Sequence, residues 1–392
     1  MERPSIGVII FVLLLGVLFL REQRLQRADE VFLRWLIRHS EPAVKSVPFT
    51  IVDIGRANPP APLDVALLVQ GALGFRPTVI AIEPVLKWSE REKDQEQIFI
   101  DQAMRVPKLV LGAELTATPD PDAPVLEIAG FPKVNGSRGD LPEFSGIERQ
   151  PDEDVRILST LGFVNAPQES ANESRVPLLF QYRGEVISSF ALQAVLLWMR
   201  LTPDEVTIDV GSAITLPNGT KIPIGADGSL VVNPRIGKRA RHVTLDELML
   251  AAQQHQSGAA TELRIEDLGT QLVLAKVESN APDLFAAAIG AIQTNTFIRR
   301  VSWIFDCVFI VVVALLSGAL RKFSRIDLAI AAIAFSAAYC LVALGIISRF
   351  SIWIPACLPL GAFWVAVMFA IFLPKSKDSA RAVTIVAPPP TP

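Results

Sequence analysis

Two acidic side chains stand where apolar, β-branched stretches of this chain end. Asp53 lies at the end of the stretch Phe49–Gly55, and Glu83 closes the stretch Thr78–Glu83. The carboxyl ends of parallel strands share one edge of a sheet, and α/β proteins bind ligands at that edge. Together with Arg56, the two acids could hold a polar ligand or a cation in one crevice. The simpler alternative is that both acids only cap helices or lie in solvent at the sheet edge.

Residues that support catalysis or metal binding are scarce. His39, His242 and His255 are the only histidines, and their spacing is not that of a zinc site. Two carboxylates without further ligands are not a calcium or magnesium signature. The chain also has no phosphate-binding loop, nucleophile elbow or glycine-rich fingerprint after a strand. We therefore expect no enzymatic activity, no metal and no cofactor.

The elements that would position these side chains follow an alternating pattern. A helical apolar spacing over Leu63–Leu73 separates the two stretches, which predicts a strand–helix–strand unit with a parallel pair. The next segments predict a helix at Gln95–Arg105 and a third buried strand at Lys108–Gly112. The fold class expected is α/β, with a mixed, partly parallel sheet, flanking helices and a separate helical membrane region.

Later patterns extend this domain to residue 300. The segment Pro119–Gly146 shows no helical or strand periodicity of its apolar residues, which predicts a long surface excursion. The remaining predicted elements are strands at residues 161–164, 178–182 and 271–275, helices at 188–200, 243–254 and 283–294, and hairpin turns at Asn218-Gly219 and Asp227-Gly228. Thr244 and Glu247 predict a capping box at the start of the second of these helices.

Three long apolar runs organise the C-terminal part of the chain. Val301–Leu320, Ile326–Ile347 and Ile352–Leu373 each reach the roughly 20 residues that span a bilayer. Ile6–Leu20 is shorter and lacks a signal-peptide cleavage site, so it predicts an uncleaved anchor. The expected organisation is an N-terminal anchor (residues 1–20), an α/β domain (21–300), three transmembrane helices (301–373) and a disordered tail (374–392).

Charge placement predicts the orientation. Basic residues lie in the tail and in the short loop between two spans, at Arg321, Lys322 and Arg325. Under the positive-inside rule, both segments are expected on the cytoplasmic side of the membrane. The protein would then be a multi-pass protein of the inner (plasma) membrane with its large domain extracytoplasmic. Arginines on the outer flanks of the spans argue mildly against this. The net charge of −3 and the absence of a basic run exclude a nucleic-acid partner.

Several short motifs carry a resemblance to a known family. They are Ile51-Val52-Asp53-Ile54, Pro77–Pro84, Leu161–Asn165 followed by Arg175–Leu178, Ser188–Gln193 and Gln271–Leu274. In this order, between one N-terminal and three C-terminal spans, they resemble the CHASE2 extracytoplasmic sensor domain. The chain departs from the family at Glu83, where an aspartate is usual, and at Lys276, where a glycine is usual.

The resemblance implies a membrane-anchored sensor that binds an unknown small molecule through its extracytoplasmic domain. Most family members carry a cytoplasmic output domain after the last span, whereas this sequence has Pro374–Pro392 there. A separate membrane or cytoplasmic protein would then have to receive the signal. The alternative is a structural or assembly subunit of an envelope complex with no small-molecule ligand, and a membrane-bound enzyme is a third possibility.

Asp306 is a further candidate because it lies inside an apolar run. A carboxylate within a membrane is costly and is commonly functional. The alternative is that Asp306 lies close enough to the helix end to reach the lipid headgroups.

Overall fold

The structure, a computed structural model, describes residues 23–118, 128–165, 174–260, 263, 268, 271–279, 283–320 and 324–372. The chain divides into two compact units, residues 1–40 with 299–392 and residues 41–298. The predicted anchor Ile6–Leu20, the basic residues Arg321 and Lys322, and the tail 374–392 lie outside the described residues.

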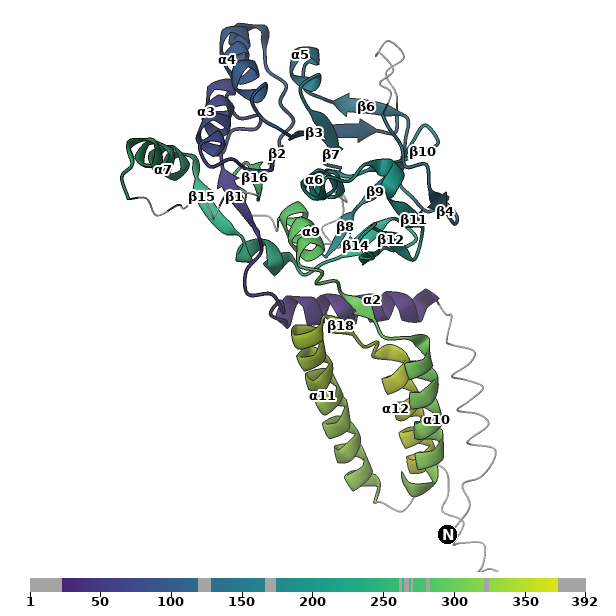
Figure 1. Ribbon diagram of the computed structural model, residues 1–392. Helices are drawn as coiled ribbons and strands as arrows, with labels where there is room; N and C mark the ends of the chain where they lie inside the picture. The colour runs from purple at the N-terminus through teal and green to yellow at the C-terminus, as the bar shows by residue number, and fades with distance from the viewer. Residues whose placement is uncertain are drawn as a thin grey trace, which may run out of the picture. The chain divides into compact units, whose positions relative to one another are not determined.

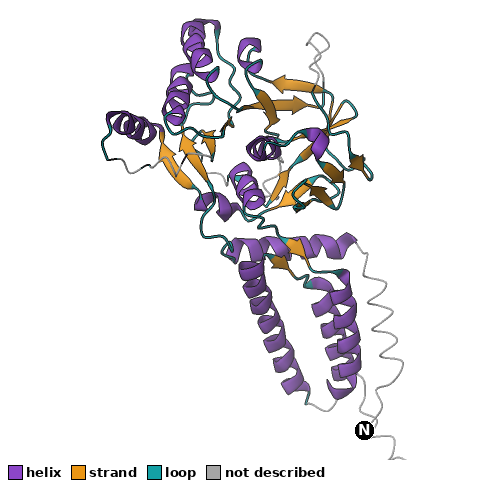
Figure 2. Ribbon diagram, in the orientation of Figure 1, coloured by secondary structure: helices purple, strands orange, loops and turns teal. Residues whose placement is uncertain are grey.

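A mixed sheet forms the centre of unit 41–298 (Figures 1 and 2). Its path is β15 (Arg241–Thr244), β1 (Phe49–Asp53), β16 (Leu272–Lys276), β2 (Val79–Ile82), β3 (Leu109–Thr116) and β6 (Gly146–Arg149), with β7 (Thr160–Phe163) also paired to β3. All neighbouring strands run parallel except β6, which is antiparallel to β3. The predicted mixed α/β class with a partly parallel sheet and flanking helices is confirmed.

Helices cover both faces of this sheet because alternate strand residues point to opposite sides. One face packs on α3 (Pro62–Leu73), α4 (Lys93–Ala103) and α7 (Leu245–Ser257), and the other on α6 (Phe190–Met199) and α9 (Leu284–Gln293). In β1, Val52 joins the first of these cores and Ile51 the second. Both residues are fully buried, as expected for parallel strands covered on two sides.

Smaller sheets complete the unit. They are β10 (Glu185–Ser188), β9 (Leu179–Tyr182) and β5 (Glu143–Phe144); β13 (Lys221–Pro223), β12 (Ala213–Thr215), β11 (Thr207–Asp209) and β4 (Val134–Asn135); and β14 (Ser229–Val231) with β8 (Arg175–Pro177). A short helix, α5, covers Glu153–Arg156, and 3-10 turns occupy Glu90–Glu92, Pro203–Glu205 and Pro234–Arg239.

Two predictions for this region were wrong. The expected excursion Pro119–Gly146 contains strands β4 and β5 in its described part. Asp227-Gly228 forms a turn, but the strand after it pairs with β8 and not with the strand before it. The hairpin at Asn218-Gly219 between β12 and β13 is confirmed. Both turns have a glycine at positive φ, so turn chemistry alone did not distinguish the two strand pairings.

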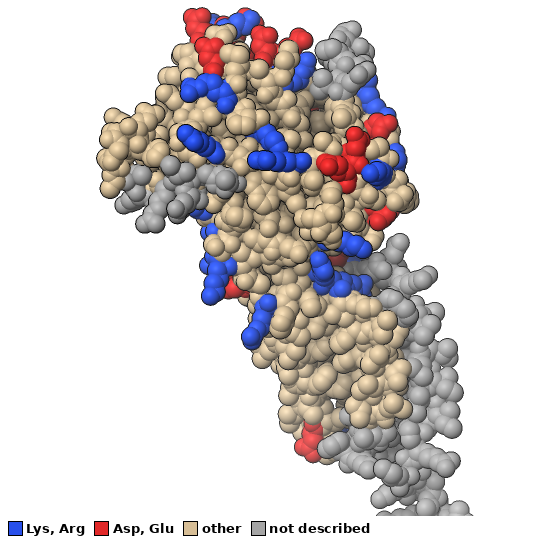
Figure 3. All heavy atoms as spheres, in the orientation of Figure 1, with Lys and Arg blue, Asp and Glu red and all other residues tan. Residues whose placement is uncertain are grey.

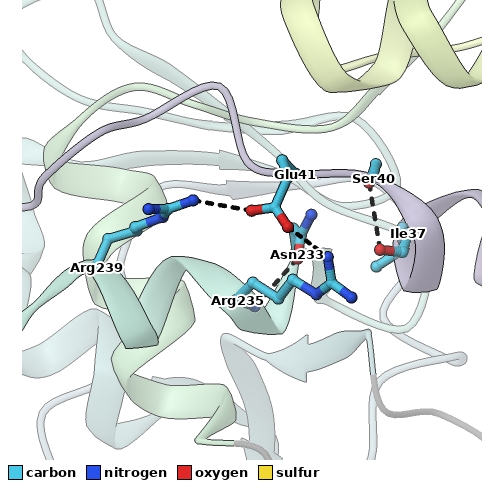
Figure 4. Close-up of polar contacts among 6 residues, drawn as sticks. All are labelled: Ile37, Ser40, Glu41, Asn233, Arg235 and Arg239. Carbon is cyan, nitrogen blue, oxygen red and sulfur yellow. Dashed lines mark hydrogen bonds and ion pairs between the residues drawn. The ribbon is translucent and has the colours of Figure 1, made fainter.

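Local polar contacts fix the helix starts and the beginning of the unit. The Thr244 side chain accepts from the Glu247 backbone N–H, and Glu247 accepts from the Thr244 N–H at 2.8 Å, which confirms the capping box. Figure 4 shows Glu41 between Arg235 and Arg239, each of whose guanidinium groups lies 2.8 Å from one carboxylate oxygen. Asn233 caps the 3-10 turn that carries both arginines.

The other unit contains α2 (Gln23–His39), α10 (Trp303–Leu320), α11 (Arg325–Phe350) and α12 (Cys357–Phe372), with a short parallel pair β17 (Arg299–Arg300) and β18 (Ile352–Trp353). The helix α2, which the sequence places in the domain of residues 21–300, thus groups with the C-terminal helices. The run Ile352–Leu373 is not one helix, because Ile352 and Trp353 pair with β17 and α12 begins only at Cys357.

Among the described residues, α11 is the one helix long and apolar enough to cross a membrane. Its most apolar 18-residue window has a mean hydropathy of 2.4, and only 17% of that window is buried, which is unlike the core helix of a soluble protein. α12 and Ile304–Leu316 of α10 are apolar but shorter. In the view of Figure 3, the surface of these three helices carries few charged side chains.

Candidate functional site

The site lies where β1, β16 and β2 end. Asp53 pairs in register with Lys276, and the preceding residue Ala275 pairs with Ile82, so Glu83 follows beside Lys276. The Glu83 N–H donates to the Ala275 carbonyl at 2.9 Å, which holds the two strand ends together. Asp53, Lys276 and Glu83 therefore follow one another across three strands, on the face that α9 covers.

A cavity of about 440 Å³ opens at this edge of the sheet. Its size falls within the range of about 300–1,000 Å³ found for small-molecule sites. It is lined by residues that follow β2 and β16 and by residues on β3 and β6. Val164 and Phe285 supply the apolar part of its wall. The polar lining residues are Asn58, Glu83, Glu114, Arg149, Glu278 and Ser279.

A glycine allows the strands to meet at the cavity. A Cβ placed on Gly112 of β3 would lie 2.1 Å from the Glu83 carbonyl oxygen. No side chain fits at that distance, so only glycine permits β3 to approach the chain at Glu83 this closely.

Most charges at this edge are paired. Arg149 binds the Glu114 carboxylate with two N–H groups, the Nε donating at 2.7 Å. The Arg56 Nε donates to the Glu278 carboxylate at 2.8 Å, although both side chains are exposed. An exposed ion pair such as Arg56–Glu278 contributes little to stability. The two parallel hydrogen bonds between Arg149 and Glu114 fix the geometry of that pair more closely.

A further ion pair is largely buried. The Lys276 Nζ lies 3.1 Å from Oδ2 of Asp283, and the two side chains are 13% and 14% exposed. The other Asp283 oxygen caps α9 by accepting from the Ala286 N–H at 2.8 Å. Asp283 therefore fixes both the start of α9 and the position of the Lys276 ammonium group.

Glu83 is the exception. Within the described part of the chain, no hydrogen bond or ion pair engages its side-chain carboxyl group. The pKa of Glu83 is raised to about 8, first by burial and then by the Asp283 charge, while the Lys276 charge opposes this shift. Because Lys276 is already paired with Asp283, its attraction does not offset the cost of desolvating a Glu83 carboxylate. Glu83 is thus a neutral carboxylic acid at neutral pH.

This shift predicts a pH dependence of stability. The folded protein retains the Glu83 proton from about pH 4.5, the ordinary pKa, up to about pH 8, whereas the unfolded chain loses it near pH 4.5. The resulting stabilisation is fully present below pH 4.5 and is lost as the pH rises through 8, and it is on the order of 5 kcal/mol. Glu83→Gln cannot ionise, so its melting temperature should fall less between pH 5 and pH 9 than that of the wild type.

Thermal unfolding of the full chain at a series of pH values measures this difference. Glu143→Gln is the matched control, because Glu143 is exposed on β5 and does not line the cavity. Identical pH profiles for the wild type and Glu83→Gln would show that the Glu83 proton does not contribute.

The structure separates the three residues that the sequence grouped. Glu83 lines the cavity, whereas Arg56 and Asp53 are not among its lining residues. Arg56 is connected to the cavity through Glu278, and Asp53 has its Oδ2 atom 3.8 Å from the His242 Nδ1. Of the predicted set, Glu83 alone therefore contacts the cavity directly.

Sequence reasoning missed the residues that surround Glu83. Lys276 directly follows the predicted strand 271–275, so the sequence pattern predicted its position at a strand end. The pattern did not predict which strands lie beside it. Glu114 lies beyond the predicted end of strand 108–112, because β3 continues to Thr116. The partner Arg149 comes from an unpredicted antiparallel strand, β6.

Metal-binding geometry is not found among the described residues, where no group of three or more His, Cys, Asp or Glu side chains could hold an ion. The site is thus a polar cavity at the carboxyl edge of a partly parallel α/β sheet. Comparison of the chain with protein-family models, curated proteins and solved structures found no match.

Proposed function

We propose that this protein is a membrane-anchored extracytoplasmic sensor that binds a small molecule and signals through its membrane helices to a separate partner protein. The observation that carries the proposal is the cavity of about 440 Å³ at the carboxyl ends of the parallel strands. Ligands of α/β sheets bind at this edge, and a few polar groups among apolar wall are typical of such sites. The resemblance to the CHASE2 domain supports the same function.

The membrane part of the proposal comprises four spans. The helix α11 has the length of a full span, and the predicted anchor Ile6–Leu20, α10 and α12 supply the other three. Large apolar side chains on these helices are exposed, including Leu315 at 64% and Leu341 at 69%, as expected of surfaces in lipid. The basic residues of the loop and tail support an orientation with the α/β domain outside and the protein in the inner membrane, under the positive-inside rule.

The chain offers a covalent route from the cavity to the membrane helices. Asp283 is paired with Lys276 and caps α9, and the chain then continues through Arg299 and Arg300 of β17 into α10. A ligand that changes the charge or position of Glu83 acts beside the start of this route. To transmit a signal, the ligand must bind one arrangement of the helices more tightly than another.

The proposal is tested by ligand-dependent stabilisation of the full chain in detergent micelles. A panel of small metabolites, ions and redox compounds should contain at least one that raises the melting temperature by several degrees. Ser279→Trp, which places a bulky ring at a cavity-lining position, should abolish the shift. Ser257→Trp, at the exposed end of α7, should not.

A different result would favour the alternative of a structural or assembly subunit. If no compound shifts the melting temperature and a protein partner co-purifies stably with the chain, the sensor proposal fails. A shift that Ser279→Trp leaves intact would place the ligand outside this cavity.

A further inference from the structure

The pairing of charges around the cavity indicates which chemistry a ligand must bring. The cations near it are already bound to carboxylates, Arg149 to Glu114, Arg56 to Glu278, and Lys276 to Asp283. An anionic ligand would have to break one of these ion pairs to find a positive partner. The carboxyl group of Glu83 is the one acid lining the cavity that the described residues leave without a partner.

We propose that the cavity binds a small organic cation, a primary amine or a guanidinium compound, whose charged group pairs with Glu83. This inference rests on the proposed ligand-binding function and names the ligand class of the same cavity. The lining contains three glutamates and one arginine, so its charge favours a cation once Glu83 is ionised. A divalent metal ion fits less well, because it needs six or more oxygen ligands and the described residues hold no such group.

The shape of the cavity supports an organic molecule. A volume of about 440 Å³ greatly exceeds that of a single ion or water molecule. Val164 and Phe285 offer apolar surface on which a short hydrocarbon stem can pack while its charged end reaches Glu83. Asn58 and Ser279 supply polar atoms elsewhere in the lining.

Binding of a cation must change the protonation of Glu83. Burial keeps the carboxyl group neutral, whereas a cation bound against it favours the carboxylate, so binding releases a proton. The charged groups facing this carboxyl group are Lys276 on β16, Asp283 at the start of α9, Glu114 on β3, Arg149 on β6 and Glu278 after β16. All of these are paired with one another or with Arg56, so Glu83 is the group expected to titrate.

The test uses isothermal titration calorimetry on the full chain in detergent micelles. The probes are methylammonium, guanidinium and 1,4-diaminobutane, with the neutral 1,4-butanediol and the anionic succinate as matched compounds. We expect at least one cation to bind ten-fold or more tightly than either matched compound. Its affinity should rise about 25-fold from pH 6.5 to pH 8.5, since the carboxylate fraction of a group with pKa 8 rises by that factor.

Titrations in phosphate and in MOPS, which differ in ionisation enthalpy, should show release of nearly one proton at pH 7. Glu83→Gln should weaken cation binding ten-fold or more and remove its pH dependence, whereas Glu143→Gln should bind as the wild type does. Equal melting temperatures of Glu83→Gln and the wild type at pH 5, where Glu83 is protonated, verify that the variant is folded.

Failure of this inference and failure of the proposed function give different results. If 1,4-butanediol or succinate binds and Ser279→Trp abolishes that binding, the cavity is a ligand site but not one for cations. Cation binding unaffected by Glu83→Gln, or unaccompanied by proton release, also overturns the assignment to Glu83. If no compound of any charge binds and a protein partner co-purifies, both the cation site and the sensor are excluded.

Discussion

Replacing Gly112 by alanine should destabilise unit 41–298 by about 3 kcal/mol or more, the upper range for overpacking a well-packed site. The new methyl group would lie 2.1 Å from the Glu83 carbonyl oxygen and 3.3 Å from a Val164 methyl group. Unlike the end of a flexible side chain, the carbonyl oxygen belongs to backbone held by the hydrogen bond from the Glu83 N–H to Ala275. The variant must therefore separate β2 from β3, which also displaces Glu83 from the cavity.

Denaturant unfolding of the full chain, followed by tryptophan fluorescence, measures the loss. Trp88 is a suitable reporter because it is buried in the core of this unit, where it packs against Phe99. Gly139→Ala is the matched control, since its Cβ would meet nothing closer than the Ser137 Oγ at 3.8 Å. We expect this control to unfold within about 0.5 kcal/mol of the wild type. An unfolding midpoint of Gly112→Ala equal to that of the wild type would contradict the close approach of β3 to Glu83.

Replacing Asp29 by alanine should have the largest effect in the helical unit. One carboxylate oxygen of Asp29, on α2, accepts hydrogen bonds from the N–H groups of Ala356 at 3.0 Å and Cys357 at 2.8 Å. These groups begin α12, where unpaired N–H groups and the helix dipole favour a negative charge. Because Asp29 is only 4% exposed, its loss leaves one buried and one partly buried N–H donor without an acceptor, at a cost of about 3 kcal/mol.

The thiol of Cys357 reports this loss directly. With Cys307 and Cys340 replaced by alanine, Cys357 is the only cysteine left in the chain. Asp29→Ala should increase the rate of its maleimide labelling several-fold, because the thiol loses its own hydrogen bond to the Asp29 carboxylate and the first turn of α12 opens more often. Asp29→Asn retains an oxygen acceptor and should change the rate much less. Equal labelling rates in Asp29→Ala and in its parent would show that the Asp29 contact does not hold this helix end.

Local patterns in the sequence predicted the elements well where one pattern determines one element. The succession of β1, α3 and β2 follows from an alternation of buried strands and helical spacing that needs no distant partner. The capping box of Thr244 and Glu247 was readable because its two residues lie three positions apart. The helix starts at Leu245 rather than Val243, since Val243 belongs to β15, which the pattern did not predict.

Strand pairing between distant segments could not be read in the same way. The predicted strand 271–275 was correct as an element, but its insertion as β16 between β1 and β2 depends on residues more than 190 positions apart. A buried parallel strand is apolar on both faces whichever strands lie beside it. The same ambiguity made Asp227-Gly228 look like a hairpin, although β14 pairs with β8.

By itself the sequence determined that Glu83 lies at the end of a buried strand and that the apolar runs lie together near the C-terminus. Tertiary structure decided what Glu83 can do. The insertion of β16 places Lys276 beside it, α9 supplies the Asp283 that pairs with this lysine, and β6 brings Arg149 to Glu114. Charge interactions depend on separation in space and on burial, so only the folded arrangement leaves Glu83 as the acid of the cavity that no described residue pairs.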